Sequence, residues 1–193
     1  MTTHIRPARI EDPPAMARVM VDTWLSAHRG QVPDAQWQRR RDEWTYAVSE
    51  GAWRGLLEEI ADGVNTDDCV YVALVEEDLV GVAVGCPSGL GLLPDAAEVS
   101  GVYVRPEHQG RGLGRRLVQT VAADQAARGR RALLISCLVA NAPARRFYEA
   151  IGGRVIGTHE TEDYGFREPQ VVYGWEDIHV LERTGGEADP GGV

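Results

Sequence analysis

Apolar positions recur along the chain at two periods, which predict an alternation of helices and strands. Spacing by three and four residues predicts helices over residues 11–27, 34–48, 53–60, 111–128 and 141–151. Alternating or β-branched runs predict strands over residues 4–8, 69–76, 79–86, 97–104, 132–139, 154–162 and 169–177. Asp34, directly behind Pro33, is the expected N-cap of the second helix. This order of elements predicts an α/β fold of the α+β type.

The length of 193 residues is most simply one domain, which we expect to span residues 1–183. Residues 184–193 are rich in glycine and acidic side chains, so a disordered tail is expected there. No apolar run approaches the roughly 20 residues of a membrane span. The first nine residues are polar and lack a signal-peptide core. These features predict a cytoplasmic protein that does not enter a membrane.

Charge and cysteine content narrow the range of ligands. The net charge is −9, which argues against general nucleic-acid binding and mildly favours cationic small substrates. The three cysteines, Cys69, Cys86 and Cys137, form no paired motif, so we expect reduced thiols and no metal site. Cys137 stands in an apolar run, which indicates a buried structural thiol rather than a nucleophile.

The segment 102–117 carries the strongest chemical signal. A β-branched run ends at Val104, Pro106 marks a turn, and three alternating glycines precede a helical pattern. Glycines let a bulky anion approach the backbone, and the first amides of a helix have no internal partners. Residues 105–116 hold four arginines against one acid, a net charge of +3 without His108. A positive segment in an acidic protein predicts a binding site for a polyanionic ligand.

Two common glycine-loop motifs do not fit this segment. A P-loop requires Gly-Lys followed by Ser or Thr, whereas Gly114 is followed by Arg115 and Arg116. The dinucleotide fingerprint that would begin at Gly110 requires a third glycine where the chain has Arg115. The loop is therefore neither of these nucleotide-binding motifs.

What remains is a Q-x-x-G-x-G pattern over residues 109–114, with a second motif, Asn-Ala-Pro-Ala-Arg-Arg-Phe-Tyr-Glu, over residues 141–149. Together they resemble the two signatures of the GNAT (Gcn5-related) N-acetyltransferases, and the order of elements resembles that family over nearly the whole chain. The resemblance implies a mixed, mostly antiparallel sheet whose fourth and fifth strands splay apart. It also implies acetyl-CoA as the co-substrate.

The resemblance implies roles for particular residues on the donor side. The backbone of Val102, Tyr103 and Val104 would pair with the pantetheine arm, and one of these amides would stabilise the oxyanion. The CoA phosphates would be held by residues of the loop and helix start, namely Gln109, Gly110, Arg111, Gly112, Leu113, Gly114 and Arg115. Asn141 and Arg145 would also contact CoA, although Asn141 is equally a helix N-cap.

Two side chains are candidates for acid–base catalysis. The resemblance implies that the Tyr148 phenol protonates the CoA thiolate, and the alternative is an aromatic that packs beside Phe147. Glu98 is the candidate base that takes the acceptor's proton. It lies four residues before Val102 on the same strand, so strand periodicity predicts that both face the same side. The alternative for Glu98 is a solvent-facing carboxylate.

The sequence indicates less about the acceptor than about the acetyl donor. Four tryptophans, Trp24, Trp37, Trp44 and Trp53, fall where the family's acceptor pocket would be, and most are expected to anchor helices. The nearby acids Asp42, Glu43, Glu50, Glu58, Glu59, Asp62, Asp67 and Asp68 form either a rim that attracts amines or a solvated face. We expect direct transfer of acetyl to a primary amine of a small molecule or peptide. A non-catalytic acyl-CoA sensor, O-acetylation, a longer acyl donor and a homodimer stay open.

Overall fold

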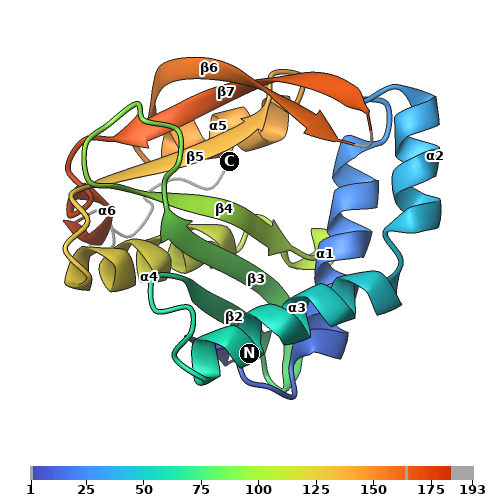
Figure 1. Ribbon diagram of the computed structural model, residues 1–193, viewed down its shortest axis with the longest axis horizontal. Helices are drawn as coiled ribbons and strands as arrows, with labels where there is room; N and C mark the ends of the chain where they lie inside the picture. The colour runs from blue at the N-terminus through green and yellow to red at the C-terminus, as the bar shows by residue number, and fades with distance from the viewer. Residues whose placement is uncertain (1, 164, 184–193) are drawn as a thin grey trace.

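The computed structural model describes residues 2–163 and 165–183, and its centre is one seven-stranded sheet (Figure 1). The strand order is β1-β2-β3-β4-β5-β7-β6. The strands are β1 (Thr3–Pro7), β2 (Cys69–Val75), β3 (Asp78–Pro87), β4 (Ala96–Val104), β5 (Ala132–Leu138), β6 (Arg154–Asp163) and β7 (Phe166–Trp175). Strands β4 and β5 pair in parallel and the other neighbours pair antiparallel. The mixed, mostly antiparallel sheet is therefore confirmed.

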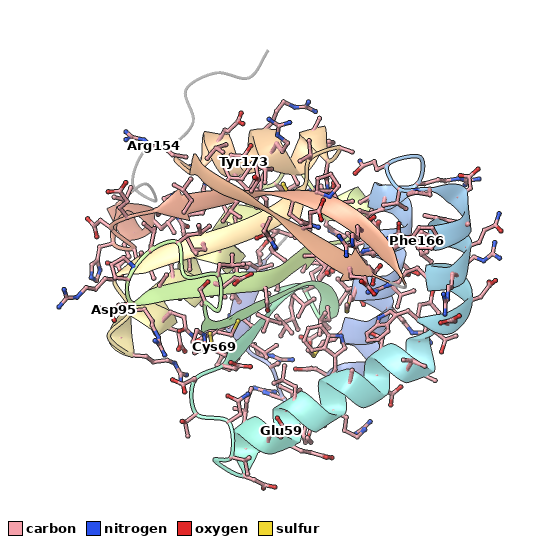
Figure 2. The ribbon with its side chains drawn as sticks, turned by 45° about the horizontal axis from the view of Figure 1, so that its top comes forward. Glu59, Cys69, Asp95, Arg154, Phe166 and Tyr173 are labelled. Atoms are coloured by element: carbon pink, nitrogen blue, oxygen red, sulfur yellow. The ribbon has the colours of Figure 1, made fainter. Side chains whose placement is uncertain are left out.

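Helices cover both faces of the sheet. They are α1 (Pro13–His28), α2 (Asp34–Glu43), α3 (Tyr46–Ala61), α4 (Leu113–Ala127), α5 (Ala142–Ala150) and α6 (Val180–Arg183), with a 3₁₀ turn η1 (Pro106–His108). Helices α1 and α3 bury Met16 and Trp53 against the β2–β3 side of one face. Helix α4 buries Leu117 and Val121 against the opposite face, where Tyr148 of α5 joins the same core. Figure 2 shows Glu59 and Arg154 at the outside of the molecule and Cys69 within it.

The parallel strands β4 and β5 separate partway along their length. They pair only where Ala96–Val99 lies beside Ala132–Ile135, although β4 continues to Val104 and β5 to Leu138. The β3–β4 register shifts at the same point, because Val84 faces Gly101 and Gly85 faces Val99. Ser100 is therefore an extra residue, a β-bulge, and a bulge bends its strand. The predicted splay of the fourth and fifth strands is confirmed.

The bulge also corrects an expectation about Glu98. Val99 and Val102, three residues apart, both pack into the α4-side core, so the strict alternation of faces is interrupted between them. Glu98 consequently faces the side opposite to Val102, and the prediction that the two share one face is wrong. The physical reason is that one inserted residue reverses the facing of every residue beyond it.

The break between the helices predicted over residues 34–48 and 53–60 lies earlier in the chain, at Trp44 and Thr45. The first ends at Glu43, and Thr45 begins the next by accepting a hydrogen bond from the Val48 amide at 3.4 Å. Pro33 occupies the N-cap position of α2, so the expectation that Asp34 caps this helix is also wrong. The local cap at Thr45 ends the helical run that periodicity alone would extend.

The chain between Trp175 and Arg183 closes the core under α4. Ile178 and Leu181 are fully buried in the cluster that contains Leu117, and Gln119 Nε2 donates to the Leu181 carbonyl at 2.9 Å. The sequence pattern had indicated no element here. The predicted tail at 184–193 lies outside the described residues.

Candidate active site

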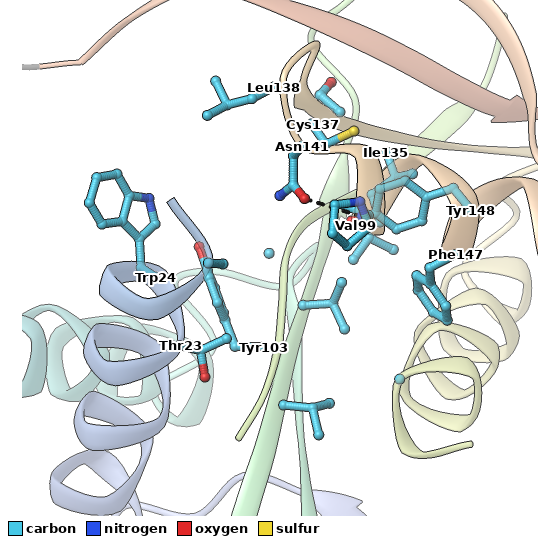
Figure 3. A pocket seen from close by; sticks show the side chains of 18 of the residues that line it. Thr23, Trp24, Val99, Tyr103, Ile135, Cys137, Leu138, Asn141, Phe147 and Tyr148 are labelled. Atoms are coloured by element: carbon cyan, nitrogen blue, oxygen red, sulfur yellow. Dashed lines mark hydrogen bonds between the residues drawn. The ribbon is translucent and has the colours of Figure 1, made fainter. Parts of the chain in front are cut away.

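A cleft of about 950 Å³ opens where β4 and β5 separate (Figure 3). Its lining comes from α1, α2, β4, the loop after β4, α4, β5, α5, β6 and β7. We call the part lined by residues 109–115 the loop end, and the part lined by α1, α2 and the β6–β7 hairpin the hairpin end. In Figure 3 Trp24 and Thr23 lie on one side, with Asn141, Phe147 and Tyr148 across from them. A volume of this size accommodates a large ligand.

The wall of the cleft is formed by strand edges. Val102, Tyr103 and Val104 line it from β4, whose other edge is paired with β3. Ser136, Cys137 and Leu138 line it from β5, whose other edge is paired with β7. Because β4 and β5 do not pair with each other here, the main-chain groups on their inner edges face the cleft. An extended amide-bearing ligand can therefore form strand-like hydrogen bonds in this gap.

The loop end is shaped by two glycines. Gly110 and Gly112 have φ of 71° and 76°, the left-handed region that disfavours side chains, and nothing lies within 4 Å of either missing Cβ. Gly112 is the N-cap residue of α4, so the free amides of the first helical turn point toward this open space. Gln109 Nε2 donates to the Val104 carbonyl at 2.8 Å, which ties the loop to the strand end.

Glycine is needed at position 114 for a different reason. A Cβ on Gly114 would lie 3.3 Å from Phe147 Cζ, so its absence lets α4 and α5 pack closely. Leu113 is buried, and Gly114 and Arg115 also line the cleft. Arg111 is exposed and is not among the lining residues. The structure therefore brings six of the seven predicted phosphate-binding residues to the cleft.

Tyr148 lies in the cleft and in the core at once. Its side chain is 6 % exposed, lines the cleft, and packs against Phe147 at 5.3 Å between ring centroids. Burial raises the pKa of Tyr148 well above its usual value, and Cys137 and Tyr103 add to this. The phenol is therefore protonated at neutral pH and is able to donate its proton. Burial likewise raises the pKa of the Cys137 thiol to about 11, which fits a thiol that is not a nucleophile.

The two remaining residues predicted to contact CoA, Asn141 and Arg145, differ in whether they reach the cleft. Asn141 lines the cleft and is also the N-cap of α5, because its Oδ1 accepts from the Ala144 amide at 3.2 Å. Arg145 is not among the lining residues. Its Nε donates to the Tyr173 hydroxyl and its Nη1 to the Val139 carbonyl, both at 3.3 Å. In this structure Arg145 ties α5 to β7 and to the end of β5.

Glu98 is not among the residues that line the cleft. Its carboxylate accepts a hydrogen bond from Ser88 Oγ at 3.1 Å, on the face of β4 where Ala96 and Leu134 form a small apolar cluster. This position follows from the bulge at Ser100. The structure therefore does not bring the two predicted catalytic side chains, Glu98 and Tyr148, to one cavity.

The hairpin end is held together by polar contacts of Arg40 and Gln36 of α2 with Asp163 of β6, which we call the clasp. Arg40 Nη1 donates to Asp163 Oδ1 at 2.9 Å, and the Arg40 guanidinium lies 5.0 Å from the centre of the Trp24 ring and 4.8 Å from that of Trp44. The Gln36 side-chain amide donates to Asp163 at 3.5 Å. Phe166 marks the end of the hairpin that approaches α2 (Figure 2).

The four tryptophans have separate positions. Trp24 lines the cleft, Trp53 is buried in the core beneath α3, and Trp37 donates from Nε1 to the Leu25 carbonyl at 3.0 Å. Trp44 packs on Arg40. Trp53 therefore anchors α3 on the sheet, as expected for most of the four, whereas Trp37 joins α2 to α1. The eight acids named from the sequence between residues 42 and 68 are mostly exposed, and none lines the cleft.

Several cleft residues were missed by sequence reasoning. They come from the hairpin, namely Thr161, Glu162, Asp163, Glu168 and Gln170, and from α1 and α2, namely Thr23 and Arg40. Their spacing carries no motif. The strand pattern placed the start of β7 at residue 169, whereas β7 begins at Phe166, so Glu168 is a strand residue. Glu168 stands between Arg167 and Pro169, and nothing in this local sequence predicts that it is buried.

Among the described residues, no group of three or more His, Cys, Asp or Glu side chains is arranged to hold a metal ion. No described helix is long and apolar enough to cross a membrane.

Comparison with known proteins identifies the family. The family model described as "Acetyltransferase (GNAT) family" matches residues 26–153, more than half of the chain. The protein therefore belongs to the GNAT acetyltransferase family. A search of the curated proteins found no match.

Solved structures share the fold at low identity. The PaiA N-acetyltransferase of Thermoplasma acidophilum, in complex with coenzyme A, has a TM-score of 0.68 and 18% identity, covering 90% of this chain and 98% of its own. An N-acetyltransferase of Staphylococcus aureus Mu50 has a TM-score of 0.66 and 18% identity, and the match covers 92% of this chain and 99% of the other. YncA of Salmonella typhimurium, solved with acetyl-CoA, has a TM-score of 0.63 and 20% identity, and the match covers 92% of this chain and 95% of the other. At these identities the likeness shows the fold.

Proposed function

We propose that the protein transfers an acetyl group from acetyl-CoA directly to a primary amine of a small molecule or a peptide. The observation that carries the proposal is the continuous path from the glycine loop, along the unpaired edge of β4, to the buried Tyr148 phenol. Family membership supports acetyl transfer. The net charge of −9 supports a cationic acceptor and argues against nucleic acid.

The loop end suits the phosphates of CoA. Gly110 and Gly112 leave open space beside the amides of the first turn of α4, and Arg115 adds a positive charge at the cleft. The amides of the pantetheine arm suit the gap between β4 and β5, where both strands have free inner edges. The thioester would then lie near the β4 residues 102–104, close to Tyr148.

The chemistry follows from these placements. The amine attacks the thioester carbon, and a β4 amide near Val104 stabilises the negative charge that forms on the carbonyl oxygen. Collapse of the tetrahedral intermediate breaks the carbon–sulfur bond, and the Tyr148 phenol protonates the departing thiolate. The raised pKa of Tyr148 keeps its proton in place until the thiolate, a stronger base than the thioester sulfur, forms. No covalent enzyme intermediate is required.

A second candidate function is a non-catalytic acyl-CoA sensor, which would need only the loop end. The presence of Tyr148 in the cleft and of a polar hairpin end beyond it favours the enzyme. The three cysteines are all free, which supports a reducing, cytoplasmic location.

Two measurements test the proposal in sequence. Acetyl-CoA should raise the Tm in a saturable manner, because a ligand that binds only the folded state stabilises it. Release of free CoA thiol should then be followed with polyamines, aminoglycosides, amino acids and peptide N-termini as acceptors. Absence of a thermal shift at millimolar acetyl-CoA would overturn the donor assignment. A shift without thiol release from any amine would favour the sensor.

A further inference from the structure

A buried carboxylate lies at the hairpin end of the cleft. Glu168 of β7 is 8 % exposed and lines the cleft. It is paired in register with Thr161 of β6, which lines the cleft too, so both residues face the same side of the hairpin. A carboxylate is costly to bury unless it is paired or used, and no ion pair of Glu168 with a described cation is present.

The neighbouring acids on the hairpin are different. Asp163 is bound by the Arg40 guanidinium, so its charge is compensated. Glu162 also lines the cleft, but it is exposed and is paired in register with Arg167, a cation on the neighbouring strand. The rise in the pKa of Glu168 that burial causes is opposed by the neutral side-chain amide of Gln36, which is itself fully buried, and by the Arg40 charge, but Glu168 forms no ion pair with a described residue. Its negative charge is therefore offset less than that of Asp163.

The other titratable groups around this end do not compete well as bases. Tyr103 of β4 is a phenol whose pKa is raised by burial. His28 of α1 donates from Nδ1 to the Trp24 carbonyl at 2.9 Å, and burial and the nearby Arg40 lower its pKa, so protonation is disfavoured. Arg40 of α2 is a cation, and Asp163 of β6 is bound to it. A cationic guest at this end therefore finds its complementary charge at Glu168.

We propose that Glu168 binds the ammonium group of the acceptor and takes up its proton, in place of Glu98, which lies outside the cleft lining. This assignment rests on the proposed acetyl transfer. The aromatic ring of Tyr103, which lines the same end, provides a further favourable surface for a cation. The acceptor class is thus a primary ammonium small or extended enough to enter beside the α2–hairpin clasp.

The proton balance of the step is complete. The ammonium transfers one proton to the Glu168 carboxylate, and the freed lone pair forms the carbon–nitrogen bond. As the carbon–sulfur bond breaks, Tyr148 gives its proton to the thiolate, and the second proton of the nitrogen passes through water to the Tyr148 phenolate. Glu168 then releases its proton to solvent. The products are the acetamide, CoA thiol and one proton.

Burial suits Glu168 to this role. Burial raises the pKa of Glu168, and the nearby Asp163 charge adds to the rise, whereas the Gln36 side chain and the Arg40 charge oppose it. A base with a raised pKa holds the transferred proton better than an ordinary carboxylate does. The value of kcat is therefore expected to rise with pH as Glu168 loses its proton. We call this rising part of the plot of kcat against pH the acidic limb.

The test measures kcat as a function of pH at saturating acetyl-CoA and an amine taken from the screen. Glu168→Gln should lower kcat by about 10²-fold or more and remove the acidic limb. The matched control is Glu160→Gln on the same hairpin, an exposed residue paired with Arg167 at 3.7 Å, which should keep both rate and limb. Acetyl-CoA binding by each variant, measured by the shift in Tm, verifies the fold.

A second variant separates a base from a structural residue. Gln36→Leu removes the hydrogen bond that lowers the pKa of Glu168, so the acidic limb should move to higher pH. An unmoved limb would overturn the assignment. So would loss of the limb in Glu98→Gln or His28→Gln while Glu168→Gln keeps it. If the wild-type protein releases no thiol with any amine, the proposed function itself fails, which is a different result.

Discussion

The loop end and the hairpin end of the cleft are built from different parts of the chain. The loop end comes from one continuous stretch, residues 109–115, and presents mainly backbone groups freed by Gly110 and Gly112. The hairpin end brings together side chains that are far apart in sequence, such as Arg40 and Asp163, which are separated by 123 positions. One end is set by backbone conformation and the other by side-chain identity.

This difference has a physical consequence. Backbone amides are the same whatever side chains surround them, so a backbone-built end holds one ligand type through extensive sequence change. An end made of side chains changes its charge and shape with each substitution. We infer that the loop end fixes the donor, and that the hairpin end determines which amine is accepted.

The largest effect is expected at the junction of the two ends, from Tyr148→Phe. Loss of the phenolic proton should reduce kcat by about 10²-fold or more, while the Kd of acetyl-CoA changes little, because in the proposed mechanism Tyr148 protonates a thiolate that exists only late in the reaction. Steady-state thiol release and calorimetric titration measure the two quantities. An unchanged kcat would remove Tyr148 as the acid.

A smaller effect is expected at the loop end from Gly112→Ala. Alanine at φ 76° is strained by roughly 1–2 kcal/mol, so the loop should shift and the Kd of acetyl-CoA should rise about tenfold. Gly129→Ala is the matched control, since Gly129 follows the other end of α4 with φ 88° and equally open surroundings. Both variants should lose similar stability in urea unfolding. An equal rise in Kd for both would show that loop geometry is not what holds the donor.

The smallest effect is expected from the clasp at the hairpin end. Arg40→Met and Asp163→Asn should each raise the KM of the amine, with a coupling energy of about 1 kcal/mol in a double-mutant cycle, and leave the Kd of acetyl-CoA unchanged. Arg54→Met on α3 removes an exposed pair with Glu50 away from the cleft lining and serves as the control. A weakened donor affinity in the clasp variants would mean that the two ends are not separate.

Local features of the chain were predictable from the sequence. The strand end at Val104, the turn at Pro106 and the start of α4 near Gly112 are all determined by residues within a few positions. The strands were predicted to within about three residues of their observed ends for the same reason. The boundary between α2 and α3 was predicted several residues too late, because the cap at Thr45 is a weaker local signal than the apolar spacing around it.

The position of Glu98 shows where local reasoning ends. Alternation along a strand predicts facing only while the register with the neighbouring strand is unbroken, and the shift between Val84 and Gly85 of β3 breaks it. Nothing in residues 96–104 alone marks Ser100 as the extra residue. Which carboxylate faces the cleft was therefore decided by strand pairing and not by spacing.

By itself, the sequence determined the donor side of this protein, because a glycine loop, a strand end and a helix start are encoded by neighbouring residues whose backbone preferences act locally. Only the tertiary structure decided the hairpin end. Glu168 is buried, faces the cleft and meets Gln36 and Asp163 because β7 pairs with β6 and α2 packs against their end. Contacts between residues more than a hundred positions apart leave no periodic trace in the chain.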